Sequence, residues 1–148
     1  MPHRTVANDL GDVALAVHWA DQRLEEVAVS KDLRADIQVC LEEALANLIL
    51  HGQCNDSDKA ILVSLDVRDD SAAIVICDRC EPFDAARVPL LPDLTRQDKG
   101  PGGHGLLLMQ GLSTHLSYRT ENGVNKLEMI FKLAGLQPQP GTLPTAKT

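Results

Sequence analysis

Aromatic residues are scarce in this sequence: they make up 3% of its 148 residues, as two Phe, one Tyr and one Trp. A hydrophobic core must therefore be built mainly from the aliphatic residues of an apolar share of 44%. A chain of this length and composition is typical of one globular domain with one sizeable core. We expect this domain to span residues 1–136 and the end of the chain, 137–148, to be a disordered tail rich in Pro and Thr.

No cluster of Lys and Arg stands out in a chain whose formal net charge is -7. Without such a cluster we expect no direct nucleic acid partner. No apolar segment approaches the roughly 18 residues that cross a bilayer, and the N-terminal stretch 1–12 lacks the apolar centre of a secretion signal. The sequence therefore predicts a cytoplasmic protein with no membrane partner.

Cysteine is also sparse, because four scattered residues are too few for a disulfide scaffold in a chain of this length. Cys77 and Cys80 form one C-x-x-C pair, but a structural zinc site usually needs a second pair, and the other soft ligands are Cys40, His51 and Cys54. A redox pair is disfavoured because no helix begins at Cys77. Reduced thiols are expected, with zinc as a minor alternative.

Apolar periodicity predicts two helices in the first third of the chain. The first runs from 12 to about 26 with Asp12 as its N-cap, and its apolar face is formed by Val13, Val17, Ala20 and Leu24. The second opens at Ser30 or Asp32 and ends at Gly52, with an apolar flank of Ile37, Leu41, Ala44, Leu45 and Leu48.

A polar flank lies beside that apolar one on the second helix, where Glu43, Asn47 and His51 follow each other at steps of four. A carboxylate and a carboxamide one turn apart, about 6 Å along the axis, can share a hard cation, a water and a phosphate. A solvated helix face is the simpler interpretation of Glu43 when it is taken alone.

Alternating apolar residues predict two hairpins. The first joins 60–68 to 71–78 through Asp69 and Asp70 and leaves Asp78 at its far end; the second joins 116–120 to 125–133. Between the hairpins, prolines interrupt every candidate helix from 82 to 103, which predicts a mobile lid. A short helix of Leu and Met follows from 105 to 113.

The glycine-rich run 100–105, GPGGHG, satisfies G-x-G-x-x-G. A dinucleotide fingerprint must leave a strand directly, whereas a polar, proline-interrupted segment precedes this run, and no Walker A signature is present. Glycines still let backbone N–H groups converge on an anion at the start of a helix, so a phosphate fits there. A hinge that closes onto a buried helix is the structural alternative.

A strand-end carboxylate such as Asp78 is most often a turn former. Within D-R-C-E-P-F-D it also stands where a buried acceptor could take a hydrogen bond from the exocyclic amine of adenine. Such a carboxylate would select adenine over guanine.

Three motifs occur in a fixed order that is more specific than any one of them. They are E-x-x-x-N-x-x-x-H from Glu43, D-x-x-x-P-F-D from Asp78 and G-x-G-G-x-G-L from Gly100. Together they resemble the N, G1 and G2 boxes of the GHKL ATPases, and over residues 5–135 the chain is most similar to anti-sigma factor serine kinases of the RsbW type. The resemblance implies the Bergerat fold, an α+β two-layer sandwich whose mixed, mainly antiparallel sheet is covered on one face by helices.

The resemblance also implies ATP and Mg²⁺ as cofactors, and roles for single residues. Glu43 matches the general base, Asn47 the magnesium ligand and Asp78 the adenine-binding carboxylate. The other residues expected at the nucleotide are His51, Cys80, Phe83, Lys99, Gly102, Gly103, His104, Gly105 and Leu106. Residues 85–101 match the lid, in which Lys99, Arg96 or Arg87 is a candidate partner of the γ-phosphate.

In the family the γ-phosphoryl group passes to a serine or threonine of an anti-anti-sigma partner with the STAS fold. The free kinase holds a sigma factor, and the family suggests a homodimer. A sensor histidine kinase fragment is a further hypothesis for the function. It is disfavoured because no helix hairpin with a phosphoacceptor histidine precedes the fold, and His18 is a single histidine on a helix of the domain itself.

Two positions depart from the family pattern. Cys80 replaces the glycine of the D-x-G in the G1 box, and Glu128 stands where the last strand commonly carries a small hydroxyl residue facing adenine, with Lys126 and Leu127 as neighbouring alternatives. These departures favour an alternative function: a module with a weak or empty nucleotide pocket that regulates by sequestering a partner protein.

Overall fold

The computed structural model describes residues 1–52, 60–82 and 103–133, with the backbone alone for His51 and for 103–107. In these residues five strands and three helices follow one another along the chain. Their bounds are β1 (His3–Val6), α1 (Leu10–Glu26), α2 (Lys31–His51), β2 (Ile61–Val67), β3 (Ser71–Asp78), α3 (Gly103–Leu112), β4 (His115–Glu121) and β5 (Val124–Lys132).

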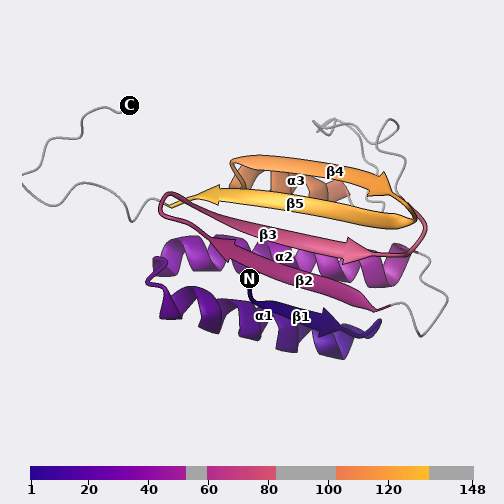
Figure 1. The fold of residues 1–148 in the computed structure, drawn as a ribbon, viewed down its shortest axis with the longest axis horizontal. Coiled ribbons are helices and arrows are strands. Elements are labelled where there is room, and N and C mark those ends of the chain that lie inside the picture. The colour runs from indigo at the N-terminus through magenta and orange to yellow at the C-terminus, as the bar shows by residue number, and fades with distance from the viewer. Residues whose placement is uncertain (53–59, 83–102, 134–148) are drawn as a thin grey trace, which may run out of the picture.

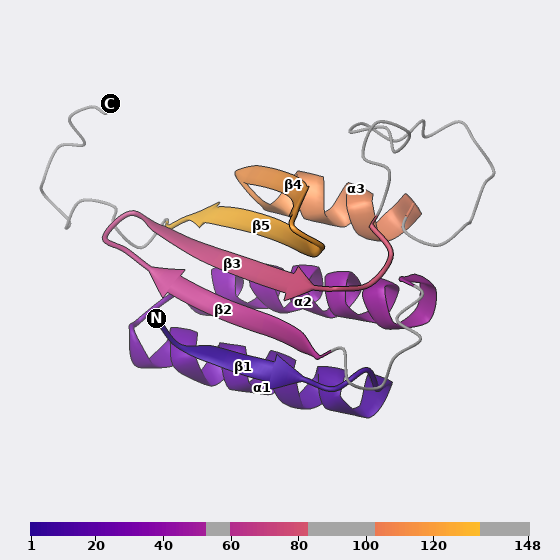
Figure 2. The ribbon, with the colours of Figure 1, turned by 45° about the vertical axis from the view of Figure 1, so that its right-hand side comes forward.

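The strands form one sheet in the order β1-β2-β3-β5-β4, and every neighbouring pair is antiparallel. All three helices lie against one face of this sheet, and no described helix lies on the opposite face (Figure 1 and Figure 2). The predicted two-layer α+β fold is thus confirmed, with a sheet that is antiparallel throughout its described strands.

The core lies between the helices and the helix-facing side of the sheet. Along β3 each second residue is buried, which is the period of a strand with one covered face. The apolar flank predicted for α2 is buried in full: Ile37, Leu41, Ala44, Leu45 and Leu48. Each of its fully buried Leu and Ile side chains contributes about 1.5–3 kcal/mol to folding.

The start of α1 differs from the prediction. Asp9 is the N-cap, and its Oδ1 accepts a hydrogen bond from Gly11 N at 3.0 Å. Asp12 lies inside the helix, where its carboxylate accepts from Ala7 N at 2.8 Å and from Arg4 at 3.2 Å. The helix therefore begins two residues before 12, and Asp12 ties its first turn to β1.

The apolar face of α1 also differs from the prediction at one position. Val13, Ala20 and Leu24 are buried as expected, but the fourth buried residue is Ala16, whereas Val17 is only partly buried against the core.

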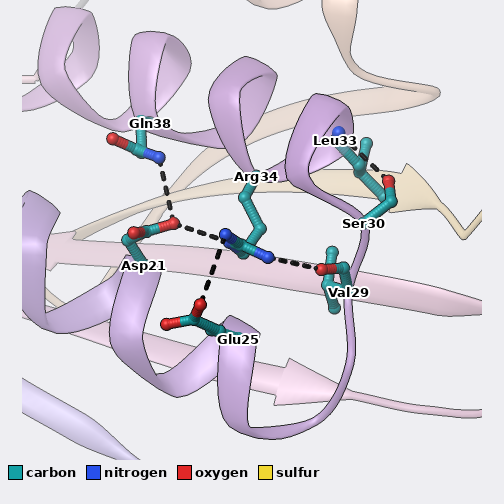
Figure 3. Close-up of polar contacts among 7 residues, drawn as sticks. All are labelled: Asp21, Glu25, Val29, Ser30, Leu33, Arg34 and Gln38. Carbon is teal, nitrogen blue, oxygen red and sulfur yellow. Dashed lines mark hydrogen bonds and ion pairs between the residues drawn. The ribbon is translucent and has the colours of Figure 1, made fainter.

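A polar network on Arg34 joins α1 to α2 (Figure 3). Arg34 Nε donates to Asp21 Oδ1 at 2.9 Å, and its Nη1 donates to Val29 O at 2.9 Å. Gln38 Nε2 donates to the same Asp21 oxygen at 3.0 Å, and Glu25 completes the cluster as a weaker ion pair at 3.7 Å. The Arg34 guanidinium thus links α2 to the Asp21 side chain of α1 and to the backbone at Val29 in the connection between the two helices.

Both predicted hairpins are present. β2 and β3 are joined through Asp69 and Asp70, and the turn between β4 and β5 has positive φ at Asn122 (53°) and Gly123 (78°), as a two-residue hairpin turn requires. β1, by contrast, was not predicted. It has four residues, of which only Val6 is buried, so it carries no readable alternation.

The lid and the tail expected at 85–101 and 137–148 lie outside the described residues. In the part of the chain that is described, no helix is long and apolar enough to cross a membrane.

Candidate functional site

Three chain segments that carry the sequence motifs meet at one end of the molecule. The C-terminal end of α2, the C-terminal end of β3 and the N-terminal end of α3 lie there together (Figure 1 and Figure 2). Glu81 N, just beyond β3, donates a hydrogen bond of 3.1 Å to Gly52 O at the end of α2. The fold thus brings the described parts of the three predicted motifs to one end of the molecule.

The flank of α2 with Glu43 and Asn47 turns toward α3. Cys40 is seven residues before Asn47, two helical turns, so the two side chains share a flank. The Cys40 thiol contacts Leu108 O of α3 at 4.0 Å, which fixes the direction of this flank. Glu43 and Asn47 are both half-buried, so neither is a freely solvated surface residue. His51 is the last residue of α2.

The pKa of the Cys40 thiol is raised by burial and by the negative charge on this flank. Burial is the larger cause, the charges of Asp36 and Glu43 contribute as well, and together they raise the pKa from 9.0 to about 12. A thiol with so high a pKa is neither a nucleophile nor a metal ligand at neutral pH.

Asp78 is a buried carboxylate, with 6% of its surface exposed. Its Oδ1 accepts two hydrogen bonds, one of 2.9 Å from Cys80 N and one of 2.7 Å from Asn125 Nδ2. The bond to Cys80 N shows that Asp78 is a turn former. Its burial indicates a further role, because a carboxylate that only forms a turn is usually exposed to solvent.

Cys80, at the position where the resemblance predicts a glycine, is buried beside Asp78. Its sulfur takes part in a disulfide, so of the described cysteines only Cys40 and Cys77 carry free thiols. The expectation of reduced thiols is therefore wrong at Cys80.

The position predicted for Glu128 is also wrong. Glu128 pairs with Val75, three residues before Asp78, and belongs to the face of the sheet that the helices do not cover. The β5 residue directly opposite Asp78 is Asn125, which is 1% exposed and shares its helix-facing side. Sequence reasoning missed Asn125, because the hairpin turn sets the register of β5 against β4 alone, whereas the pairing of β5 with β3 joins strands far apart in the sequence.

The glycine box is described only in part. Gly103, His104, Gly105 and Leu106 form the first turn of α3, which begins two residues earlier than predicted. The expected nucleotide residues Phe83, Lys99 and Gly102 lie outside the described residues, as do the lid candidates Arg87 and Arg96.

A cavity of about 460 Å³ lies elsewhere, between α1 and α2. On α2 it is lined by Gln38, Glu42 and Ala46, the row of side chains next to that of Glu43 and Asn47. None of the residues predicted at the nucleotide lines it, so this groove is separate from the candidate site.

The donors on α2 suit a hard cation. The Asn47 carboxamide and the Glu43 carboxylate offer oxygen atoms one turn apart, which is the donor type that Mg²⁺ prefers. Among the described residues no group of three or more His, Cys, Asp or Glu side chains is placed to hold a metal. A magnesium ion at this flank would therefore need further oxygen ligands from phosphates, as is usual at nucleotide sites.

Comparisons with known proteins show which family the fold resembles. The family model described as a histidine kinase-like ATPase domain matches residues 6–131. The chain is 32% identical over 120 residues to the serine/threonine-protein kinase BtrW of Bordetella bronchiseptica, covering 77% of this chain and 81% of that protein. It is 27% identical over 94 residues to the serine-protein kinase RsbW of Oceanobacillus iheyensis, covering 60% of each.

A solved structure, that of the RsbU and RsbW domains of Rv1364c from Mycobacterium tuberculosis, superimposes with a TM-score of 0.61 at 16% identity. The match covers 89% of this chain and 32% of that one. At this identity the likeness concerns the fold.

Proposed function

The chain belongs to the family of histidine kinase-like ATPase domains, and from this membership we propose that it is an ATP-dependent protein serine/threonine kinase that doubles as an anti-sigma-type switch protein. The observation that carries the proposal is the buried carboxylate of Asp78 at the C-terminal end of β3, which lies beside the C-terminal end of α2, the helix that carries Glu43 and Asn47. Two protein kinases among its relatives, BtrW and RsbW, support the reaction class.

In this mechanism Asp78 would accept a hydrogen bond from the exocyclic amine of adenine, and the backbone N–H groups of the first turn of α3 would bind the phosphates. The positive end of that helix, whose first and third residues are glycines, favours phosphate oxygens. Asn47 would hold the magnesium ion, with Glu43 beside it. When bound, the ion would neutralise part of the negative charge on the phosphates.

Glu43 is proposed as the general base. The hydroxyl oxygen of a protein serine or threonine forms a bond to the γ-phosphorus, and its proton passes to the Glu43 carboxylate. The bond between the γ-phosphorus and the bridging oxygen breaks, and ADP leaves with that electron pair. The chain's own contribution is position and charge, since phosphoryl transfer needs little covalent help from the protein.

The proposed acceptor is a small STAS-fold anti-anti-sigma protein, and the proposed second partner is a sigma factor held while the acceptor is phosphorylated. The kinship with RsbW supports this assignment. A specific observation favours a second candidate, a binding module with a weak nucleotide pocket: Cys80 fills the place of the family glycine beside Asp78 and is buried there.

Calorimetric titration with ATP and magnesium separates the two functions. A kinase binds the nucleotide, so binding heat is expected. Absence of heat at millimolar ATP would rule out the kinase function and favour the binding module that sequesters a partner. In transfer assays with γ-labelled ATP and STAS-domain proteins of the same organism, Glu43→Gln should lower phosphoryl transfer by about 10²-fold or more, as loss of a general base does.

The matched control for the transfer assay is Glu42→Gln. Glu42 is the preceding residue of α2, but it is exposed and lines the groove toward α1. Its replacement removes the same charge one position away and should leave transfer unchanged. Equal transfer rates for Glu43→Gln and the unmodified protein would show that Glu43 is not the base.

A further inference from the structure

The side-chain amide of Asn125 is fully engaged in the core at the end of β3. Its Nδ2 donates to Asp78 Oδ1 at 2.7 Å and to Cys80 O at 2.9 Å, and its Oδ1 accepts from Thr120 Oγ1 at 2.8 Å. Asp78 Oδ1 and Cys80 O only accept hydrogen bonds, so the NH₂ group must face them. The hydroxyl of Thr120 on β4 holds the other end of the amide, and this arrangement permits one orientation.

This amide leaves the two oxygens of Asp78 in different states. Oδ1 receives two donors, Asn125 Nδ2 and Cys80 N, which together use its two lone-pair directions. Within the described part of the chain Oδ2 receives none. The carboxylate is therefore held with one oxygen committed to the protein and the other available to a ligand.

A carboxylate fixed in this way distinguishes purine bases. Adenine presents an N–H donor at its exocyclic position, whereas guanine presents a carbonyl oxygen there, which would face Asp78 Oδ2 as a second acceptor. The discrimination depends on the orientation of the carboxylate, because a carboxylate free to rotate could turn away from the base.

We propose that Asn125 is the positioning residue of the adenine-recognising carboxylate, and that the chain Thr120–Asn125–Asp78 sets the base selectivity of the site. The inference rests on the proposed nucleotide function and adds to it two residues from the last hairpin. A merely structural tie between β5 and the segment after β3 would make the same hydrogen bonds but would not affect selectivity.

The test compares the dissociation constants of ATP, GTP and purine riboside 5′-triphosphate, which lacks the amino group, by calorimetry with magnesium present. For the unmodified protein, a hydrogen bond to a charged acceptor predicts that ATP binds more than about tenfold tighter than the purine analogue. In Asn125→Leu, which is similar in size, we expect this ratio to fall below about threefold while the affinity for the analogue changes little. A structural role alone would weaken both ligands equally and leave the ratio unchanged.

Thr120 provides a second variant whose side chain is exposed, so its replacement does not threaten the core. Thr120→Val keeps the shape of the side chain and removes the hydroxyl, so it should lower the preference for ATP over the purine analogue several-fold. Thr120→Ser keeps the hydroxyl and should bind the two ligands with the same ratio as the unmodified protein. If Asn125→Leu does not fold, this pair decides.

Two results would overturn the inference, and they are distinguishable. Unchanged selectivity in Asn125→Leu and Thr120→Val, with ATP bound by the unmodified protein, refutes the role of Asn125 and leaves the kinase intact. Failure of the unmodified protein to bind any adenine nucleotide refutes both.

Discussion

The backbone N–H of Glu81 donates a hydrogen bond of 3.1 Å to the carbonyl oxygen of Gly52. This bond joins the segment that follows Asp78 to the residue that ends α2, so the two halves of the candidate site share a backbone contact. Gly52 also donates its own N–H to Leu48 O at 2.8 Å, which closes the last turn of the helix. A change at Gly52 should therefore affect both the helix end and the site.

Gly52→Ala should lower the free energy of unfolding by about 1–3 kcal/mol, as overpacking of a well-packed position does. A Cβ at this position would lie 2.4 Å from Leu48 O, a backbone atom that cannot move without opening the last turn of α2. Urea denaturation measures the change. The control is Gly111→Ala in α3, where an added Cβ meets nothing within 4 Å. The free energy of unfolding of Gly111→Ala should rise by about 0.5–1 kcal/mol, because Ala has a higher helix propensity than Gly. A Gly52→Ala protein as stable as the unmodified chain would contradict the steric argument.

Arg34→Met should cost about 1–3 kcal/mol of stability, because it leaves the Val29 carbonyl and the Asp21 carboxylate without their charged donor. The matched control is Arg23→Met on α1. Arg23 pairs with Glu26 at 3.5 Å, but both side chains are mostly exposed, at 49% and 64%. Such surface pairs contribute little, so the control should stay within about 0.5 kcal/mol of the unmodified protein in the same urea titration. Similar losses for both variants would show that the Arg34 network has no special weight.

The raised pKa of the Cys40 thiol predicts that the free energy of unfolding falls at alkaline pH. Its pKa is 9.0 when unfolded and about 12 when folded, so between these values the unfolded chain loses a proton that the native protein keeps. Stability from this group is intact below pH 9 and declines toward pH 12, by at most about 1.4 kcal/mol per pH unit. The stability difference between the unmodified protein and Cys40→Ala, measured at intervals above pH 8, should therefore shrink as pH rises. A difference that does not change with pH would contradict the raised pKa.

Asn47 should confer the magnesium dependence of nucleotide binding. Removal of the metal with EDTA should weaken ATP binding by about tenfold or more in the unmodified protein and much less in Asn47→Ala, which has lost a metal ligand. Asn47→Asp keeps an oxygen donor and should keep the metal dependence. Calorimetric titrations with and without EDTA give the comparison. An Asn47→Ala protein that still loses affinity on chelation would place the metal on other ligands.

The sequence predicted well the elements in which several independent signals agree. For α2, the cap at Ser30, the buried flank from Ile37 to Leu48 and the closing Gly52 all point to the same helix, and the structure has all three. The last hairpin, which was predicted around residues 121–123, likewise has its turn there, at Asn122 and Gly123. Local periodicity with strong boundary residues is sufficient for such elements.

The sequence predicted poorly what depends on the third dimension. Asp9 and Asp12 are equally good caps by residue type, and only the contact of Asp12 with Arg4 and Ala7 of the N-terminal segment decides between them. Glu128 and Asn125 occupy the same strand, and only the register against β3 shows which of them faces Asp78. For Glu43, Asn47 and Asp78, the motifs identified the residues, and their proposed roles stay predictions.

The place of β3 in the sheet has a dynamic consequence. It lies between β2 and β5, and each of its residues from Ser71 to Asp78 has a partner on β5, whereas β1 and β4 are the edges. In a sheet of this kind the central amides exchange with solvent deuterium through global opening, while edge amides exchange through local fraying. We therefore expect the amides of β3 to exchange more slowly than those of β1 and β4, and the carboxylate proposed to bind adenine to keep its place when the edge strands fray.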